Sequence, residues 1–315
     1  MKFTELLKLS TEDRITNNTT EEKLNIKEIF TAALDAGVKN DPSGVEGKWS
    51  EFKDSNILSG NEKKSVRRVA VGIDIESEEI LMISELNRKG RNIDLAIAHH
   101  PEGKGLYHLY EMVKLQEELL MRSGVSVSSA EGILGETNSK YKRAFTGVNY
   151  NRAVESAKLL DVNFMNIHTP ADNMVHSYII KIMEEKKPET LDDIIKVLLE
   201  EKEYEKAEKD GAGPVIINGK GSYRAGKIYV DMTGGVEASK KMYKAMESAG
   251  VSTIIGMHMS EEHLEEAKKN CINVIMAGHM ASDSLGINLI LDEIEKIEPF
   301  EEIVEMSGFI RVNRI

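Results

Sequence analysis

Residues 94–101 read DLAIAHHP, an apolar segment that ends in two adjacent histidines and a proline. The apolar run at 95–99 is typical of a short strand that is buried on both faces. A second β-branched strand is predicted at 65–75, with helices at 77–87 and 106–123. Strands that alternate with helices through short connections are typical of a parallel sheet. The segment and its neighbours therefore predict an α/β fold.

A second series of strands and helices follows a glycine-rich stretch near residues 210–221. Strands are predicted at 227–232, 252–256 and 274–277, and helices at 237–249, 261–270 and 286–296. A chain of 315 residues is long enough for two ordinary domains. We expect the first domain to span 1–170, with 287–315 returning to it, and the second to span 171–286.

The predicted strands end in histidines at three places. His99 and His100 stand at the end of the apolar run at 95–99. His168 ends a strand that begins at residue 164, and His279 follows the strand at 274–277. Functional side chains collect at the carboxyl ends of strands in open α/β sheets. The three strand ends are therefore predicted to contribute to one site.

An aspartate stands four residues after two of these histidines: Asp172 follows His168, and Asp283 follows His279. If a helix begins near His279, this spacing places both side chains on one helix face. Imidazole and carboxylate without thiolate suit Zn, Mn, Fe, Co or Ni. Three histidines with two carboxylates are enough for two such ions about 3.5–4 Å apart.

Each element also has a structural explanation when it is taken alone. One histidine of the adjacent pair can be buried and hydrogen-bonded while the other is exposed. Asp172 can cap the helix that follows Pro170, and Asp283 or Ser282 can cap the next one. The coincidence of all three strand ends favours the metal site over these separate explanations.

Composition excludes several other kinds of site. The formal net charge of −12 argues against nucleic acid and against an anionic membrane surface as the main partner. The single cysteine, Cys271, excludes an internal disulfide and a cysteine-based metal cage. No secretory leader and no apolar stretch of membrane-spanning length is visible, so a cytoplasmic location is expected. The P-loop, the Rossmann glycine motif and the G-x-S-x-G motif are all absent.

Several motifs resemble, in order, those of one known family. They are DSNILSG at 54–60, DLAIAHHP at 94–101, HTPAD at 168–172 and NVIMAGHMASD at 273–283. The chain resembles the Nif-three-like, or YbgI-like, family of dinuclear-metal proteins, whose members are often described as GTP cyclohydrolase I type 2. The resemblance covers roughly residues 54 to 290.

The resemblance implies two α/β domains that face each other across a metal-binding cleft. It assigns the metal ligands to His99, His100, Asp172, His279 and Asp283. The family has Glu at the last position, so the shorter Asp283 requires its helix to come closer. Family members form toroidal homohexamers, and a homohexamer is therefore the implied assembly.

A second departure from the family follows Asp172, where a usual Gly-Gly pair is replaced by Asn173 and the residues after it. This departure brings His176 to a position where it can join the site. We expect His168, His176 and His258 to lie around the metal ligands without binding metal themselves.

The function predicted from these observations is a metal-dependent hydrolase that holds two divalent ions and uses a metal-activated water. The expected substrate is a small nucleotide or another phosphorylated compound, with a GTP cyclohydrolase-type reaction among the possibilities. Glu102, just beyond the histidine pair, is the candidate general base or supporting residue. The alternative is a non-catalytic assembly or regulatory protein in which metal binding is coupled to folding.

Overall fold

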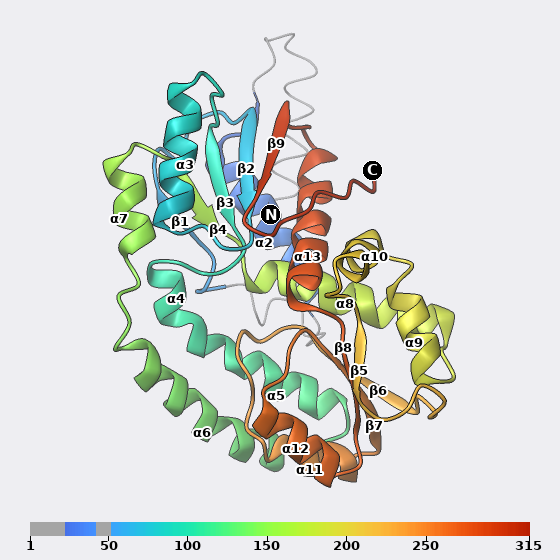
Figure 1. Ribbon diagram of the computed structural model, residues 1–315. Helices are drawn as coiled ribbons and strands as arrows, with labels where there is room; N and C mark the ends of the chain where they lie inside the picture. The colour runs from blue at the N-terminus through green and yellow to red at the C-terminus, as the bar shows by residue number, and fades with distance from the viewer. Residues whose placement is uncertain (1–22, 42–51) are drawn as a thin grey trace.

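The structure is a computed structural model that describes residues 23–41 and 52–315. It contains two separate β-sheets with helices packed against both faces of each (Figure 1). Most neighbouring strands are parallel, and each sheet has one antiparallel strand at its edge. The predicted α/β class with two mostly parallel sheets is therefore confirmed.

The first sheet has the strand order β1-β4-β3-β2-β9. Its strands are β1 Asn56–Ser59, β2 Arg68–Gly72, β3 Leu95–Ala98, β4 Phe164–Asn166 and β9 Glu302–Met306. Every residue of β3 is buried, as its apolar sequence requires of a central parallel strand. Strand β9 lies near the end of the chain and pairs in parallel with β2, so the sheet combines segments that are far apart in sequence.

The second sheet has the strand order β5-β8-β7-β6. Its strands are β5 Val215–Asn218, β6 Lys227–Asp231, β7 Val251–Gly256 and β8 Asn273–Met276. The predicted strands at 227–232, 252–256 and 274–277 correspond to β6, β7 and β8. The glycine-rich stretch before them contains β5, which pairs with β8 in the antiparallel direction.

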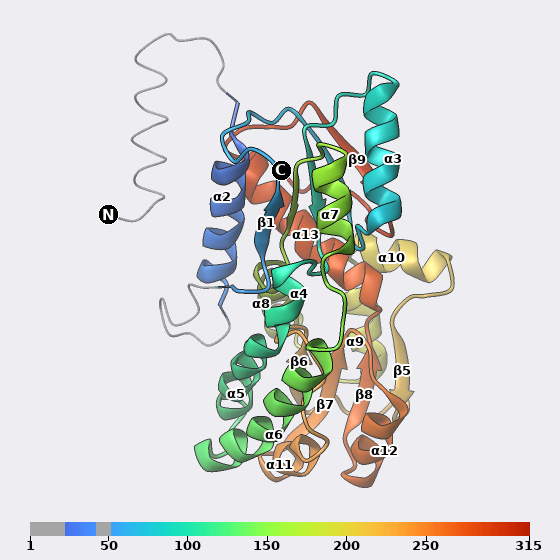
Figure 2. The same ribbon diagram turned by 90° about the vertical axis from the view of Figure 1, so that its left-hand side faces the viewer.

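The helices form layers on both sides of the sheets (Figure 2). They are α2 Ile26–Lys39, α3 Ser77–Arg88, α4 Lys104–His108, the 3₁₀ turn η1 Leu109–Met112, α5 Val113–Arg122, α6 Val127–Phe145, α7 Arg152–Leu159, α8 Thr169–Lys186, α9 Leu191–Leu198, α10 Lys202–Lys209, α11 Met242–Ser248, α12 Glu261–Lys269 and α13 His279–Glu295. Helices α3 and α7 share a hydrophobic cluster with one face of the first sheet. Helices α5, α6 and α11 do so with one face of the second sheet.

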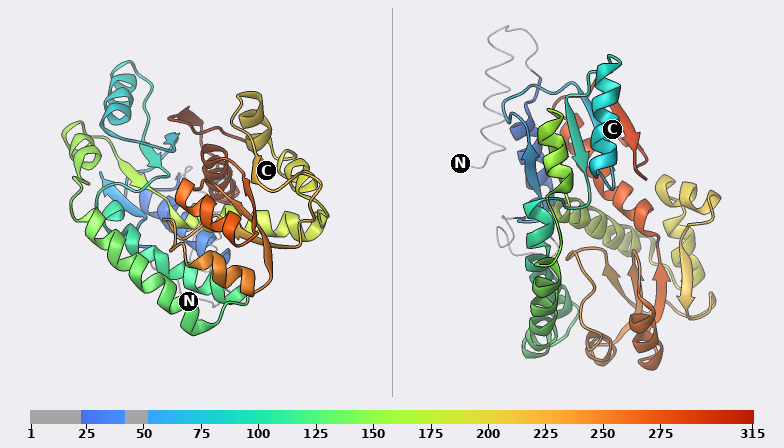
Figure 3. Two further views of the ribbon diagram at one scale, coloured as in Figure 1. Left: turned by 60° about the horizontal axis from the view of Figure 1, so that its bottom comes forward. Right: turned by 60° about the vertical axis from the view of Figure 1, so that its left-hand side comes forward.

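Helices α8 and α13 take part in the hydrophobic cores of both sheets. Ala171 of α8 and Ile287 of α13 belong to the cluster on the first sheet. Ile179 of α8 and Leu285 of α13 belong to the cluster on the second sheet. Figure 3 shows α8 running between the two sheets. These two helices therefore fix the position of one sheet relative to the other.

The predicted domain boundaries remain a prediction. Residues 113–145 fall within the predicted first domain, but helices α5 and α6 in this range pack on the second sheet. The predicted helix at 286–296 begins earlier than expected, because α13 begins at His279. The predicted helix at 106–123 is divided by the 3₁₀ turn, and α6 and β1 have no counterpart among the sequence-based predictions.

The N-terminal turn of α8 lies very close to two other helices. A Cβ atom on Gly286 of α13 would lie 2.6 Å from the carbonyl oxygen of Ala171, and one on Gly37 of α2 would lie 2.5 Å from Cα of Pro170. Both contacts are with backbone, or atoms fixed to it, that cannot move aside easily. The approach of α13 to α8 therefore requires glycine at position 286.

No helix among the described residues is both long and apolar enough to cross a membrane.

We expect Gly286→Ala to lower the free energy of unfolding by about 1–3 kcal/mol, because the added methyl group forces α13 away from α8. Urea denaturation of the two proteins measures this difference. The matched control is Gly132→Ala in α6, where nothing lies within 4 Å of an added Cβ. There the higher helix propensity of alanine should leave stability unchanged or raise it. Equal stability of Gly286→Ala and the natural protein would contradict the role of the close crossing.

Candidate metal centre

Three strand ends meet at one place in the structure. His99 and His100 follow β3, and His168 lies between β4 and α8 at the N-cap position of that helix. His279 is the first residue of α13, directly after Gly278, whose backbone has a φ of 105° that favours glycine. The local turns at the strand ends therefore direct all four imidazoles to the same region.

The two aspartates lie one helical turn into α8 and α13. Asp172 is in the first turn of α8, and neither it nor Asp283 occupies an N-cap position. Asp283 Oδ2 lies 3.3 Å from His279 Nε2, which is the contact that the spacing of four residues predicts. The capping explanation for either aspartate is therefore wrong.

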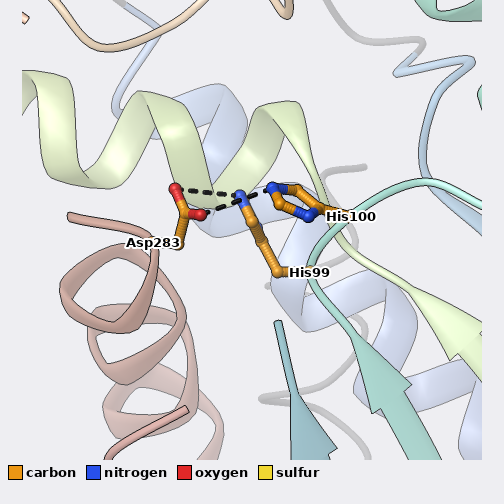
Figure 4. Close-up of side chains that lie close together, drawn as sticks. All are labelled: His99, His100 and Asp283. Carbon is orange, nitrogen blue, oxygen red and sulfur yellow. Dashed lines mark ion pairs between the residues drawn. The ribbon is translucent and has the colours of Figure 1, made fainter. Parts of the chain in front are cut away.

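The carboxylate of Asp283 faces the imidazoles of His99 and His100 (Figure 4). His99 Nε2 is 3.4 Å from Asp172 Oδ1 and 3.4 Å from Asp283 Oδ1. His100 Nε2 is 3.4 Å from Asp283 Oδ2. On the other side of the cluster, His168 Nε2 is 3.8 Å from Asp172 Oδ2. One histidine, His99, thus contacts both carboxylates.

The opposite ring nitrogen, Nδ1, has an oxygen partner in three of these histidines. Nδ1 of His99 lies 3.1 Å from the carbonyl oxygen of Ile167, and Nδ1 of His100 lies 2.6 Å from Asp74 Oδ1. A carbonyl oxygen can only accept, so Nδ1 of His99 carries the proton and its Nε2 presents a lone pair. Such oxygen partners commonly fix the orientation of metal-binding imidazoles.

Asp54 is the oxygen partner of the Nδ1 atom of His168. Its Oδ2 accepts hydrogen bonds from His168 Nδ1 at 2.7 Å and from the Thr169 hydroxyl at 2.6 Å. Asp54 is fully buried. Its backbone carbonyl also accepts from the Asn166 side chain at the end of β4. The sequence interpretation used Asp54 only as part of a motif and assigned no role to Asp54 or to Asp74.

Burial makes the electrostatics of the cluster unusual. Burial raises the pKa of Asp172 to about 8, although His99 opposes this shift. Burial acts in the same direction on Asp283, but the surrounding histidines hold its pKa well below the usual range. Burial lowers the pKa of His100, but Asp283 and Asp74 overcome this effect and raise it to about 10. The carboxylates and imidazoles therefore stabilise one another's charges.

Asp283 supplies the observation that tests whether a metal ion fits. The residue is 1% exposed, and neither of its carboxylate oxygens has a hydrogen-bond partner among the described residues. A buried carboxylate without partners is strongly unfavourable unless a cation accompanies it. Two ligand atoms that each lie about 2.0–2.2 Å from a tetrahedral ion are roughly 3.3–3.6 Å apart. The distances from Asp283 to His99 and His100 agree with a shared ion, whereas His279 contacts Asp283 but lies outside this group of ligand atoms.

The described residues offer two overlapping groups of ligands. One contains His99, His100 and Asp283, and the other contains His99, His168 and Asp172. His168 was expected only to support the ligands, but its Nε2 is placed as a ligand atom. A single Nε2 can bind only one ion, so His99 can serve one group at a time. The structure therefore supports a buried metal site without fixing the number of ions.

The other residues singled out from sequence are divided between this site and its surroundings. The ring of His258 lies 4.9 Å from that of His279. His176 instead lines a different cavity, together with Arg122. Both of its ring nitrogens lack partners within the described part of the chain, and burial lowers its pKa to about 3. Glu102 does not line the metal cavity, and burial beside Glu76 raises its pKa to about 7.

The metal cluster forms one wall of a cavity of about 70 Å³. The opposite wall comes from the ends of β6 and β7, from the segments after them, and from α5. It includes Gln116, Asp231, Glu237, Tyr243 and His263. None of these residues was predicted. The signal for Asp231 was available, because it is the last residue of the apolar strand β6 and thus lies at a carboxyl end like the three histidine sites.

Comparison with solved structures supports the family suggested by the motifs. A NIF3 superfamily protein from Sphaerobacter thermophilus is similar over 91% of this chain and 100% of its own, with a TM-score of 0.79 and 26% identity. This chain is similar to NIF3 superfamily proteins in fold and in sequence. The family predicted from the sequence motifs is therefore confirmed.

Two more distant structures share the architecture alone. Reduced HcgD from Methanocaldococcus jannaschii has a TM-score of 0.56 and 12% identity over 89% of this chain and 97% of its own. The protein TTHA1606 from Thermus thermophilus has a TM-score of 0.50 and 14% identity over 90% of this chain and 98% of its own. No family model and no curated protein matches the sequence.

We expect His279→Ala to lose at least one metal ion per chain while the protein remains folded, because the ring lies at the cavity and outside both hydrophobic cores. Elemental analysis after purification without chelator measures the metal content, and circular dichroism checks the fold. His108→Ala is the matched control, since His108 pairs with Glu111 away from the cluster. Unchanged metal content in His279→Ala would remove this residue from the ligand set.

We expect Asp54→Asn to weaken metal binding by about 10- to 100-fold, although Asp54 does not face the cavity. The amide loses the negative charge that holds the His168 ring in its orientation. Competition with a fluorescent chelator measures the affinity. Asp94→Asn is the control, because Asp94 likewise accepts backbone hydrogen bonds but lies at the far end of β3. Equal affinity in Asp54→Asn and Asp94→Asn would contradict the positioning role.

Proposed function

We propose that this protein is a metal-dependent hydrolase that holds two divalent ions. His99, His100, Asp172, His279 and Asp283 would bind them, with His168 completing the set on the side of Asp172. The observation that carries the proposal is the buried carboxylate of Asp283, which faces three imidazoles and has no hydrogen-bond partner among the described residues. The identity of the metal remains among Zn, Mn, Fe, Co and Ni.

A pair of divalent ions would lower the pKa of a water molecule toward neutrality and polarise the bond to be cleaved. The residues of the chain orient the imidazoles that would bind the ions. Asp54, Asp74 and the carbonyl of Ile167 hold three imidazole rings by their Nδ1 atoms. The hydrophobic cores behind the cluster exclude water from the far side of the ligands. The small cavity in front of them leaves room for only a few water molecules or for the reacting end of a substrate.

We infer a small nucleotide or another phosphorylated compound as the substrate class. A cavity bordered by metal ligands on one side supports this choice, because two ions can bind the oxygens of a phosphate without help from lysine or arginine. A GTP cyclohydrolase-type reaction, a cytoplasmic location and a homohexamer follow only from the sequence and the family resemblance. They remain predictions.

A second candidate function is structural or regulatory. It is favoured by the placement of Asp172 on α8 and Asp283 on α13, since these helices belong to the cores of both sheets. An ion shared between the helices would hold the sheets in register, and metal supply would then control folding. The cavity beside the ligands favours the hydrolase, because a purely structural site has no need of space for a substrate.

We expect the protein purified without chelator to contain about two metal ions per chain and to hydrolyse a small phosphoester in their presence. Asp283→Asn should lower both metal content and the hydrolysis rate by about tenfold or more, because the amide is uncharged. The assay uses p-nitrophenyl phosphate and GTP as separate substrates, with His108→Ala as the control.

Two outcomes would reject the hydrolase. Full metal content without turnover of either compound, together with a large loss of stability on metal removal, would support the structural function instead. Absence of metal, not restored by dialysis against Zn, Mn, Fe or Co, would contradict both functions.

A further inference from the structure

The cavity wall opposite the metal cluster carries several hydrogen-bond acceptors among methionines and other apolar residues. Asp231 and Glu237 bring two carboxylates to it. No lysine or arginine is among the described residues that line the cavity. The Asp231 side chain accepts no hydrogen bond from the described residues, and burial together with Glu237 raises its pKa to about 6. Asp231 is therefore largely ionised at slightly alkaline pH and has no partner among the described residues.

Gln116 adds a neutral acceptor to the same wall. Its Nε2 donates a hydrogen bond of 2.6 Å to the carbonyl oxygen of Val236. This bond fixes the orientation of the amide, because a carbonyl can only accept. Oε1 is therefore the atom left over, and it is buried without a partner among the described residues in a side chain that is 4% exposed. A buried acceptor of this kind is costly unless a ligand or water donates to it.

Most side-chain donors in this wall already have partners within the protein. The Thr233 hydroxyl donates to Asn173 Oδ1 at 2.8 Å. The Tyr243 hydroxyl pairs with His263 Nδ1 at 3.1 Å. Nε2 of His263 is turned toward Glu237, at 3.9 Å from its Oε2. The imidazole of His258 is the main side-chain group left as a possible donor, and it packs beside His279.

We propose that Asp231, Glu237 and Gln116 bind a positively charged or N–H-rich group of the substrate, such as an ammonium or amidinium group, while the opposite end of the substrate reaches the metal cluster. This inference rests on the proposed function for the identity of the reacting end. It adds that the substrate carries cationic or hydrogen-bond-donating nitrogen, and that a second phosphate does not enter this cavity.

Charge and size both support this substrate class. Acceptor oxygens on three side chains complement an ammonium group, which has three donors and no acceptor. An additional phosphate would place negative charge beside two carboxylates, at a wall with no lysine or arginine among its described residues. The space between the two walls is small, about 70 Å³, so a compact group such as ammonium suits it.

Two small phosphomonoesters of nearly equal shape test the proposal. O-phosphoethanolamine carries an ammonium group where n-propyl phosphate carries a methyl group. Isothermal titration of the metal-loaded full-length protein with each compound measures binding without requiring turnover. We expect the ammonium compound to bind about tenfold or more tightly, because hydrogen bonds to charged groups contribute more than neutral ones.

The Asp231→Asn/Glu237→Gln variant should lose most of this preference while it binds n-propyl phosphate at least as well as before. Glu78→Gln, an exposed carboxylate on α3, is the control and should keep the preference. Glu237→Gln alone replaces the double variant if that protein does not fold, and it should reduce the preference partially. Metal content is measured for every protein.

Equal binding of the two compounds by the natural protein would overturn the proposal, as would an undiminished preference in the folded, metal-loaded variants. Hydrolysis of the bound compounds is followed separately. A clear preference without hydrolysis would reject the proposed reaction and retain the inference about the wall. Hydrolysis without a preference would support the proposed reaction and reject the inference about the wall.

Discussion

The close crossing of α8 and α13 is the constraint on which the site depends. Asp172 and Asp283 come from these two helices, and both carboxylates contact His99. The crossing is possible because Gly286 has no Cβ to meet the backbone of Ala171. An aspartate reaches one methylene less far than the glutamate that the family resemblance implies at this position. The short side chain of Asp283 therefore needs α13 close to α8, and Gly286, three residues later on the same helix, allows that approach.

The same helices connect the chemistry of the site to the stability of the fold. Each packs into the cores of both sheets, so the distance between the two carboxylates cannot change without disturbing both. Bringing buried carboxylates together is unfavourable on its own, because each loses its hydration. The apolar packing of α8 and α13 supplies the free energy that holds them there. A cation at Asp283 would then replace the lost hydration without any change in the backbone.

The sequence predicted the parts of the site that follow from local rules. Strand ends could be recognised from apolar runs such as 95–99, and the spacing of four residues correctly paired His279 with Asp283. The residues that were missed come close only through the tertiary fold. Asp54 precedes His168 by more than a hundred residues, and its role follows from the pairing of β1 with β4. His176 was expected beside Asp172, but α8 passes from the metal cavity to a different one within that turn.

The two walls of the cavity have a common electrostatic requirement. The metal ligands on one side present carboxylates and imidazoles, and the opposite wall includes Asp231, Glu237 and Gln116, whose Oε1 atom has no partner among the described residues. Neither wall includes a lysine or arginine among its described residues. Metal ions can supply positive charge at the ligand cluster, but Asp231 and Gln116 Oε1 in the opposite wall still lack a donor among the described residues. That wall is therefore complementary to a donor that the bound molecule itself carries.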